Sequence, residues 1–165
     1  MKKIIQKMSQ GLEWIGGLMI LLMTVVVLLQ VIMRYIFNSP LTWTEEFARY
    51  LFVYITFLGA ALLIYERGHL YVEIIFNNLP IRIRKILQLI LDVIILGFSV
   101  FLTISAKASM DVAEGSFSTA MHIPMNYIGF SVLLGALLII LFSLWNIVQD
   151  VTVSYTHLRA HETGR

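Results

Sequence analysis

The sequence predicts an all-α integral membrane protein with four transmembrane helices in one compact bundle. Of its 165 residues, 59% are hydrophobic and 13% are charged, whereas an ordinary globular domain is about 45–50% apolar and about 25% charged. The apolar residues gather in four long stretches, and roughly 20 such residues cross a bilayer. We therefore expect a single membrane domain over residues 1–150, too short to include a soluble catalytic domain.

The first span is predicted at residues 14–36. Positions 14–33 (WIGGLMILLMTVVVLLQVIM) carry no charge, and twenty residues at about 1.5 Å each cross about 30 Å of hydrocarbon. The lysines before them are also typical of a signal peptide, but this apolar stretch exceeds the roughly 7–15 residues of such a segment and no small-residue cleavage pattern follows. We expect it to stay in the protein as an anchor.

The second span is predicted at residues 45–65. Asn38, Ser39 and Pro40 break the first helix, and the spacing of Thr42 and Glu45 fits a capping box that opens the next one. The uncharged part of this span, residues 50–65, has only sixteen positions. The helix must therefore include the charged turn that precedes it, which we expect at the membrane surface.

A basic connection follows the second span. Four apolar residues in it are spaced to form one stripe if the segment is helical: Leu70, Tyr71, Ile74 and Ile75. We expect a short interfacial helix here, between the second and third spans. Pro80 is well placed to begin the next helix, because proline favours the first helical position.

The third and fourth spans are predicted at residues 86–106 and 124–149. Asp92 interrupts the third, and Pro124 starts the fourth, which carries no charge as far as Gln149. The fourth span also carries small residues suited to close helix contact: Gly129, Ser131, Gly135 and Ala136.

The basic residues predict the topology. Up to Asp150, seven Lys and Arg lie in the N-terminal tail and the second connection, against three near the first and third connections. By the positive-inside rule both termini are cytoplasmic, as an even number of spans requires. Residues 151–165 are polar and are interpreted as a non-native or disordered tail, with a genuine cytoplasmic tail as the alternative.

Several classes of function are disfavoured. There is no cysteine for thiol chemistry and no Gly-rich phosphate loop, and the basic residues are not gathered on one face that could bind nucleic acid. None of the four histidines lies in a predicted span, so a bis-histidine haem site is not expected. His69 and Glu73, at i and i+4, offer two metal ligands without an evident third. We expect no enzyme activity, no metal and no cofactor.

Asp92 is the most conspicuous ionisable residue in a span, because a charge at the centre of a membrane helix costs about 2.5–3.5 kcal/mol on insertion scales. It follows the basic residues Arg84 and Lys85 by about 10 Å along a helix, so it lies nearer the cytoplasmic side. We prefer a structural hydrogen bond or a subunit contact for Asp92 over ion transport, which stays open.

A charged corner is predicted at the external end of the first two spans. Arg34 ends the first helix, Trp43 is an interface anchor, and Glu45 and Glu46 both reach Arg49 at i+4 and i+3. The hairpin also brings Arg34 near the two glutamates. Two interpretations stay open, a corner recognised by a partner and an ordinary charged membrane edge.

These residues carry a resemblance to a known family. Residues 34–38 (RYIFN), 41–51 (LTWTEEFARYL), 57–61 (FLGAA), His69, Leu79-Pro80 and Ile123-Pro124-Met125 resemble the small membrane subunit of tripartite ATP-independent periplasmic (TRAP) transporters, the DctQ-like family. The resemblance covers roughly residues 10–150, and the family has four membrane helices with both ends cytoplasmic. One departure is Glu73, where the family more often has aspartate.

The resemblance implies an accessory subunit in a bacterial or archaeal cytoplasmic membrane. Such a subunit forms a static scaffold beside a large sodium-coupled elevator subunit, which imports an organic acid delivered by an external binding protein, so no substrate-binding residue is expected in this chain. Carried over by position, Arg34, Trp43, Glu45, Glu46 and Arg49 form the external corner, and His69 and Pro80 shape the cytoplasmic connection. The alternative is a stand-alone small transporter or channel that uses Asp92.

Overall fold

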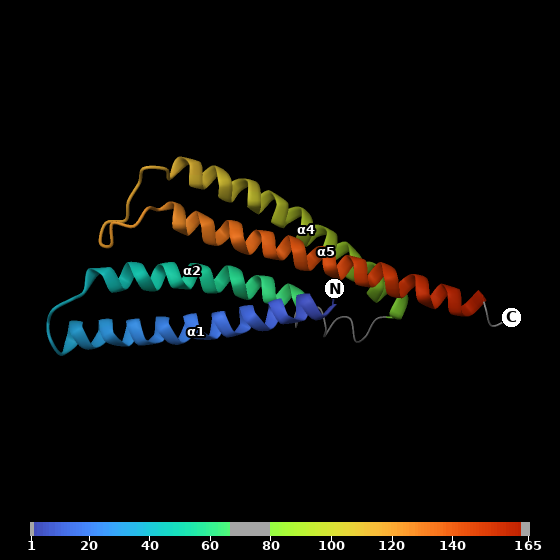
Figure 1. Ribbon diagram of the computed structural model, residues 1–165, viewed down its shortest axis with the longest axis horizontal. Coiled ribbons are helices and arrows are strands. Elements are labelled where there is room, and N and C mark those ends of the chain that lie inside the picture. Colours follow the sequence, from blue (N-terminus) through green and yellow to red (C-terminus); the bar gives the residue numbers. More distant parts are fainter. Residues whose placement is uncertain (1, 67–79, 163–165) are drawn as a thin grey trace.

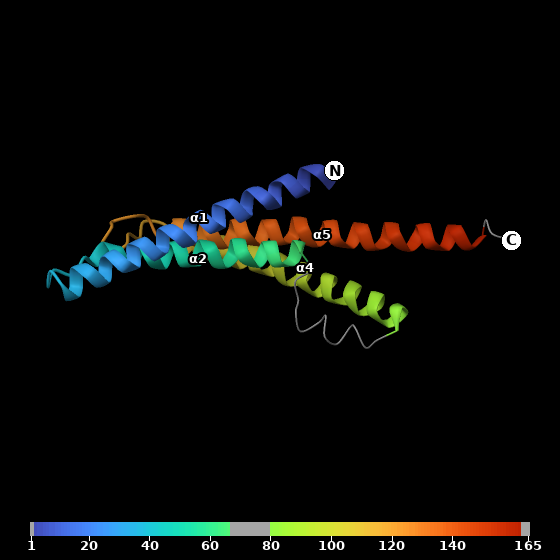
Figure 2. The ribbon, with the colours of Figure 1, turned by 90° about the horizontal axis from the view of Figure 1, so that it is seen from below.

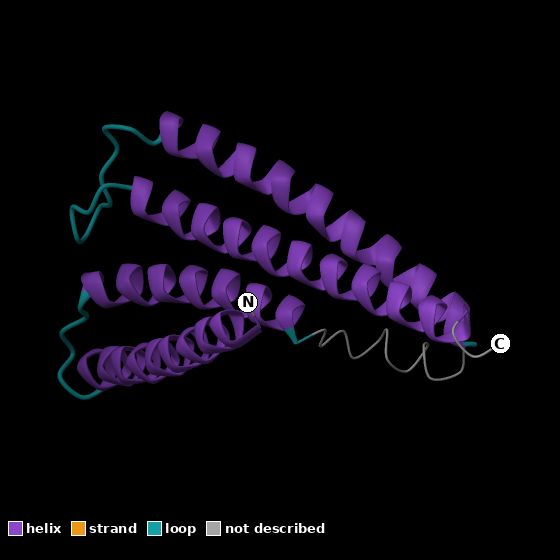
Figure 3. Ribbon diagram, turned by 45° about the vertical axis from the view of Figure 1, so that its right-hand side comes forward, coloured by secondary structure: helices purple, strands orange, loops and turns teal. Residues whose placement is uncertain are grey.

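The computed structural model describes residues 2–66 and 80–162, and this part of the chain is built from four α-helices. They are α1 (Lys2–Tyr35), α2 (Thr42–Tyr65), α4 (Ile81–Val112) and α5 (Asn126–Glu162), and described loops join α1 to α2 and α4 to α5 (Figure 3). All four are long and apolar enough to cross a membrane. The predicted fold class, an all-α membrane protein with four transmembrane helices, is confirmed.

The break between α1 and α2 follows the expected residues. α1 ends at Tyr35, and Asn38 adopts a left-handed backbone conformation with φ of 51°, which asparagine tolerates better than most residues. The Ser39 backbone N–H then donates to the Met33 carbonyl at 3.0 Å, closing the turn.

The predicted capping box at the start of α2 is wrong. Leu41 is the N-cap residue and no side chain caps the helix, because Thr42 is already helical. Instead the buried Thr44 hydroxyl donates to the Leu41 carbonyl at 2.7 Å, and the Glu45 carboxylate accepts a hydrogen bond at 3.2 Å from Gln30 on α1. Glu45 therefore links two helices rather than closing one.

The two prolines sit differently at the starts of their helices. Pro80 directly precedes α4 as its N-cap residue, with an extended backbone conformation, so it lies one residue before the first helical position at which it was predicted. Pro124 lies two residues before the first residue of α5 and pairs with Phe117 in an isolated β-bridge. That bridge holds the chain extended at Pro124, so the helix begins only at Asn126.

The helices form an open row in the order α1, α2, α5, α4 (Figure 1). Viewed from below, α1 and α4 diverge on opposite sides of α5 toward the end that carries the N-terminus (Figure 2). The compact bundle expected from the sequence is therefore not what the structure has. A physical reason is that lipid is as apolar as the helix faces, so no hydrophobic effect drives the row to close.

The two ends of the row differ. The loops of residues 36–41 and 113–125 lie together at one end, here called the loop end, and the starts of α1 and α4 and the ends of α2 and α5 lie at the other, the terminal end (Figure 1). Both described ends of the chain thus lie on one side, as an even number of spans requires.

The core lies toward the terminal end. Ala61 and Ile64 of α2 are buried with Phe142 of α5, whose ring centroid lies 5.2 Å from that of Tyr65. Side chains from the start of α1, including Leu12, pack against this cluster.

The small residues of α5 permit close helix contacts, as predicted. A Cβ atom at Gly135 would lie 2.5 Å from the Phe57 Cβ and 3.2 Å from the Phe57 carbonyl atoms of α2. A Cβ atom at Gly129 would overlap the Met110 side chain of α4. These two glycines let α5 pack directly against both neighbours.

The structure leaves several predictions untested. The expected interfacial helix, His69 and Glu73 lie outside the described residues. α5 continues through residues 151–162 as helix, so the assignment of residues 151–165 as a non-native tail stays a prediction.

Candidate interaction site

The most extensive polar contact at the loop end is centred on Glu46 of α2. Its Oε2 atom accepts hydrogen bonds from the Ser118 hydroxyl at 2.7 Å and the Met121 backbone N–H at 3.0 Å. Its Oε1 atom accepts from the Thr119 hydroxyl at 2.7 Å and the Ala120 backbone N–H at 3.1 Å. One carboxylate thus ties the loop between α4 and α5 to the start of α2.

The loop also supports its own shape. The Ser118 backbone N–H donates to the Ile123 carbonyl at 2.9 Å, and the Ser118 carbonyl lies 3.1 Å from His122 Nδ1. Because a carbonyl only accepts, Nδ1 must carry the proton in this hydrogen bond. The backbone φ is positive at Gly115, 81°, and at His122, 52°. Between these two positions, the backbone N–H groups of residues 120 and 121 donate to Glu46.

The other predicted corner residues are only partly brought together. Arg34 and Glu45 line one small hollow of about 150 Å³, beside Gln30. Arg34 and Arg49 are both exposed, and within the described residues neither forms an ion pair with Glu45 or Glu46. The expected ion pairs are replaced by hydrogen bonds.

Trp43 lies on the first turn of α2, with 39% of its surface exposed. Its ring packs at 6.4 Å from that of Phe47, one helical turn along. It takes no part in the contact centred on Glu46, so the structure separates Trp43 and Arg49 from the residues that hold the loop.

A second polar cluster lies at the other half of the row, among α2, α4 and α5. Asp92 is 7% exposed, and its backbone carbonyl accepts a hydrogen bond from the Ser143 hydroxyl at 3.0 Å. One turn further along α5, the Asn146 amide donates to the Ile64 carbonyl of α2 at 2.8 Å. α5 is therefore hydrogen-bonded to both of its neighbours.

Ser143 and Asn146 were missed by the sequence analysis, which took the fourth span as a source of small residues only. Their i, i+3 spacing in a span without charges was the signal, because polar side chains in a membrane helix usually face another helix. Ser118 and Thr119 were missed as well, since their partner Glu46 lies more than seventy residues away.

A hollow of about 570 Å³ opens among α1, α2 and the start of α5. Met19, Leu51 and Tyr127 are among its mostly apolar lining residues. Beside it the Tyr54 hydroxyl donates to the Tyr127 carbonyl at 2.9 Å, a third tie between α2 and α5.

The polar side chains described above hold helices together. Among the side chains that the structure describes, no group of three or more His, Asp or Glu residues gathers as metal ligands. The polar groups of Glu46, Tyr54, Ser143 and Asn146 hydrogen-bond across helix boundaries. The arrangement favours a rigid unit that other proteins contact.

Comparison with known proteins gives a family match. Residues 23–153 match the family model described as "Tripartite ATP-independent periplasmic transporters, DctQ component". This range includes the Glu46 contact and both sides of the cluster at Asp92 and Asn146.

Known proteins similar to this chain agree with the family match. A putative TRAP transporter small permease protein of Haemophilus influenzae is 26% identical over 148 residues, which is 90% of each chain. A second such protein from that species is 38% identical over 96 residues, covering 58% of this chain and 60% of the relative. The sialic acid TRAP transporter permease protein SiaT of Haemophilus influenzae is 36% identical over 73 residues, 44% of this chain and only 12% of SiaT. The matched region thus spans less than two thirds of the last two relatives.

Proposed function

Since the chain belongs to the DctQ family of TRAP transporter components, we propose that it is the static scaffold subunit of a TRAP transporter, paired with a large permease subunit. Its relatives are small permease proteins, and its four apolar helices make it a multi-pass protein of the bacterial inner membrane. The proposal concerns what this subunit does inside the complex.

The observation that carries the proposal is that α2 and α5 are tied at both ends of the row. Glu46 holds the loop that leads into α5, and Asn146 holds the other half of α5 to the end of α2. Packed helices joined in this way have little freedom to slide. Such a unit suits a fixed support against which another subunit moves.

The moving parts belong to the proposed partners. A large subunit would bind sodium and an organic acid and carry them by an elevator motion, while a soluble external binding protein delivers the acid. The relative SiaT supports a large partner, because the part that matches this chain is 12% of a much longer permease protein.

The proposed orientation places both termini in the cytoplasm and the loop end outside. The external corner then consists of Arg34, Trp43, Glu45, Glu46 and Arg49, of which Glu46 fixes the neighbouring loop. In this orientation the loop of residues 113–125 faces the external binding protein.

The test is to recover the subunit with whatever it binds. A tag on the N-terminus, extraction of native membranes in mild detergent and mass spectrometry would identify the bound proteins and their stoichiometry. We expect a larger multi-span permease at one to one. Sodium-dependent uptake by the purified chain alone in liposomes would contradict the proposal.

A second candidate is a stand-alone transporter or channel. The observation in its favour is that Asp92, an ionisable residue of a span, is buried where α4 contacts Ser143 of α5. The Asp92→Asn variant separates the two functions. If it abolished ion coupling while assembly and expression stayed intact, Asp92 would be part of a transport path.

A further inference from the structure

The glycines of α1 and α5 are used differently. At Gly129 and Gly135 of α5, a neighbouring helix fills the space that a side chain would take. At Gly16 and Gly17 of α1, a Cβ atom would meet nothing within 4 Å. The glycines of α5 therefore lie at contacts with neighbouring helices, whereas Gly16 and Gly17 of α1 border open space.

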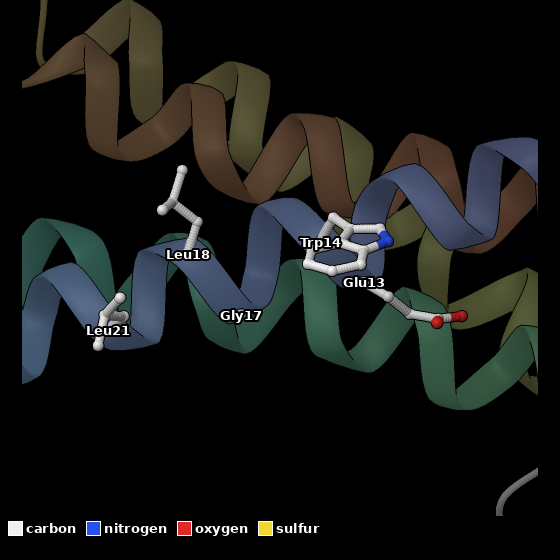
Figure 4. Close-up of a pocket in the computed structure, with 5 residues that line it drawn as sticks. All are labelled: Glu13, Trp14, Gly17, Leu18 and Leu21. Atoms are coloured by element: carbon white, nitrogen blue, oxygen red, sulfur yellow. The ribbon is translucent and has the colours of Figure 1, made fainter.

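Gly17 forms the floor of a hollow on α1. The hollow has a volume of about 510 Å³ and is lined by Glu13, Trp14, Gly17, Leu18 and Leu21 (Figure 4). Trp14, Leu18 and Leu21 are 83%, 67% and 61% exposed. Leu12, in contrast, packs against the core cluster of α2 and α5. At 100° per residue, the lining residues lie on the side of α1 that faces away from that core.

Glu13 adds a charge to this otherwise apolar hollow. Its neighbour Leu12 packs against the cluster of Ala61 and Ile64, so Glu13 lies level with the last turn of α2, at the proposed cytoplasmic edge of the predicted first span. It is exposed, and within the described residues it forms no hydrogen bond or ion pair. Ionisable groups at such depths usually pair with another polar group.

We propose that this hollow on α1 docks a transmembrane helix of the large permease subunit, which brings a basic or hydroxyl side chain to Glu13. This inference rests on the proposed function. A recess at Gly17 lets a partner backbone approach closely, and a polar group one turn away adds a hydrogen bond, the two means by which helices associate in lipid. A lipid tail has no polar group to offer Glu13.

The exposed face of α4 provides the matched comparison. Gly97 is also an exposed helical glycine with nothing within 4 Å of an added Cβ atom. Its surroundings include Ile94 and Phe98, which are 60% and 62% exposed. From residue 93 to residue 106 α4 has no charge, so this face suits lipid alone.

The test compares Gly17→Leu with Gly97→Leu in the complete transporter, isolated through a tag on this subunit. Both glycines are exposed and an added Cβ atom at either one meets nothing within 4 Å, so both variants should fold. We expect Gly17→Leu to lower recovery of the large subunit by about tenfold, the change that about 1.4 kcal/mol of lost affinity produces. Recovery with Gly97→Leu should match the wild type.

A second measurement uses the absence of cysteine from the sequence. A thiol-attached photo-crosslinker on Leu21→Cys should capture the large subunit, whereas one on Phe101→Cys of α4 should not. Capture from position 101 alone, or full recovery of the large subunit with Gly17→Leu, would overturn the docking site and leave the proposed function standing. Failure of the wild-type chain to retain any large subunit would overturn the proposed function, and the docking site with it.

Discussion

α1 and α5 are both long apolar helices, but they relate to the rest of the chain in different ways. α5 lies between α2 and α4, and in the most apolar window of its span 28% of residues are buried, against 6% for α1. Among the described glycines, only those of α5 lie at close contacts with another helix. The difference separates a tied unit of α2, α4 and α5 from a helix whose outer face is left for lipid or a partner.

The comparison also shows what holds helices together in a membrane. Apolar area contributes little there, because lipid covers an exposed leucine as well as another helix does. Close backbone approach and interhelical hydrogen bonds decide instead. The contacts of Gly135, Glu46 and Asn146 all lie within the tied unit, and each can be removed by one substitution.

Gly135→Leu should cause the largest loss of stability. The new side chain meets the Phe57 backbone, which has no rotamer through which to move aside, so α2 and α5 must separate. Overpacking of this kind costs about 1–3 kcal/mol. The measurement is the midpoint of thermal unfolding of the purified chain in detergent. A midpoint equal to that of the wild type would show that the α2–α5 contact is not needed for stability.

Glu46→Gln should release the loop of residues 113–125. A glutamine has one acceptor oxygen in place of two, and in either orientation its NH₂ group would face a backbone N–H that can only donate, that of Ala120 or that of Met121. We expect hydrogen exchange at the amides of Ala120 and Met121 to become severalfold faster.

Glu45→Gln is the matched control for that variant. Glu45 accepts a single hydrogen bond, from Gln30, and a glutamine oxygen can accept the same bond. Exchange at Ala120 and Met121 should therefore stay at the wild-type rate. Equal acceleration in both variants would mean that overall charge at the corner, rather than the Glu46 contact, orders the loop.

Asn146→Leu should have a smaller effect. It removes one buried interhelical hydrogen bond, to the Ile64 carbonyl, and such bonds in membrane proteins contribute about 0.6 kcal/mol on average and at most about 1.7 kcal/mol. The unfolding midpoint should fall less than for Gly135→Leu. Leu144→Ala, at a 47% exposed position on the same helix, is the control that should leave it nearly unchanged.

The features that depend on local sequence were predictable. Uncharged stretches set the spans because burying a charge in lipid is costly, and Asn38 and Pro80 mark helix ends through their own backbone preferences. The close contact at Gly135 also followed from small residues at helical spacing.

The features that depend on distant residues were not predictable. The sequence predicted an ion pair between Glu46 and Arg49, one helical turn away, but the hydrogen-bond partners of Glu46 lie in the loop of residues 113–125. Nothing in the composition selects which helices touch, so the open row was missed. The roles of Ser143 and Asn146 likewise emerge only once α5 is placed between α4 and α2.

Gly16→Ala tests the comparison of α1 with α5 at a glycine of α1. A methyl group at Gly16 meets nothing within 4 Å, and alanine is a better helix former than glycine by up to about 1 kcal/mol. The purified chain should therefore unfold at the same temperature as the wild type or slightly higher, in contrast to Gly135→Leu. A fall in the unfolding midpoint would mean that α1 packs against the tied unit more closely than its exposed face indicates, and the division between the two regions would have to be abandoned.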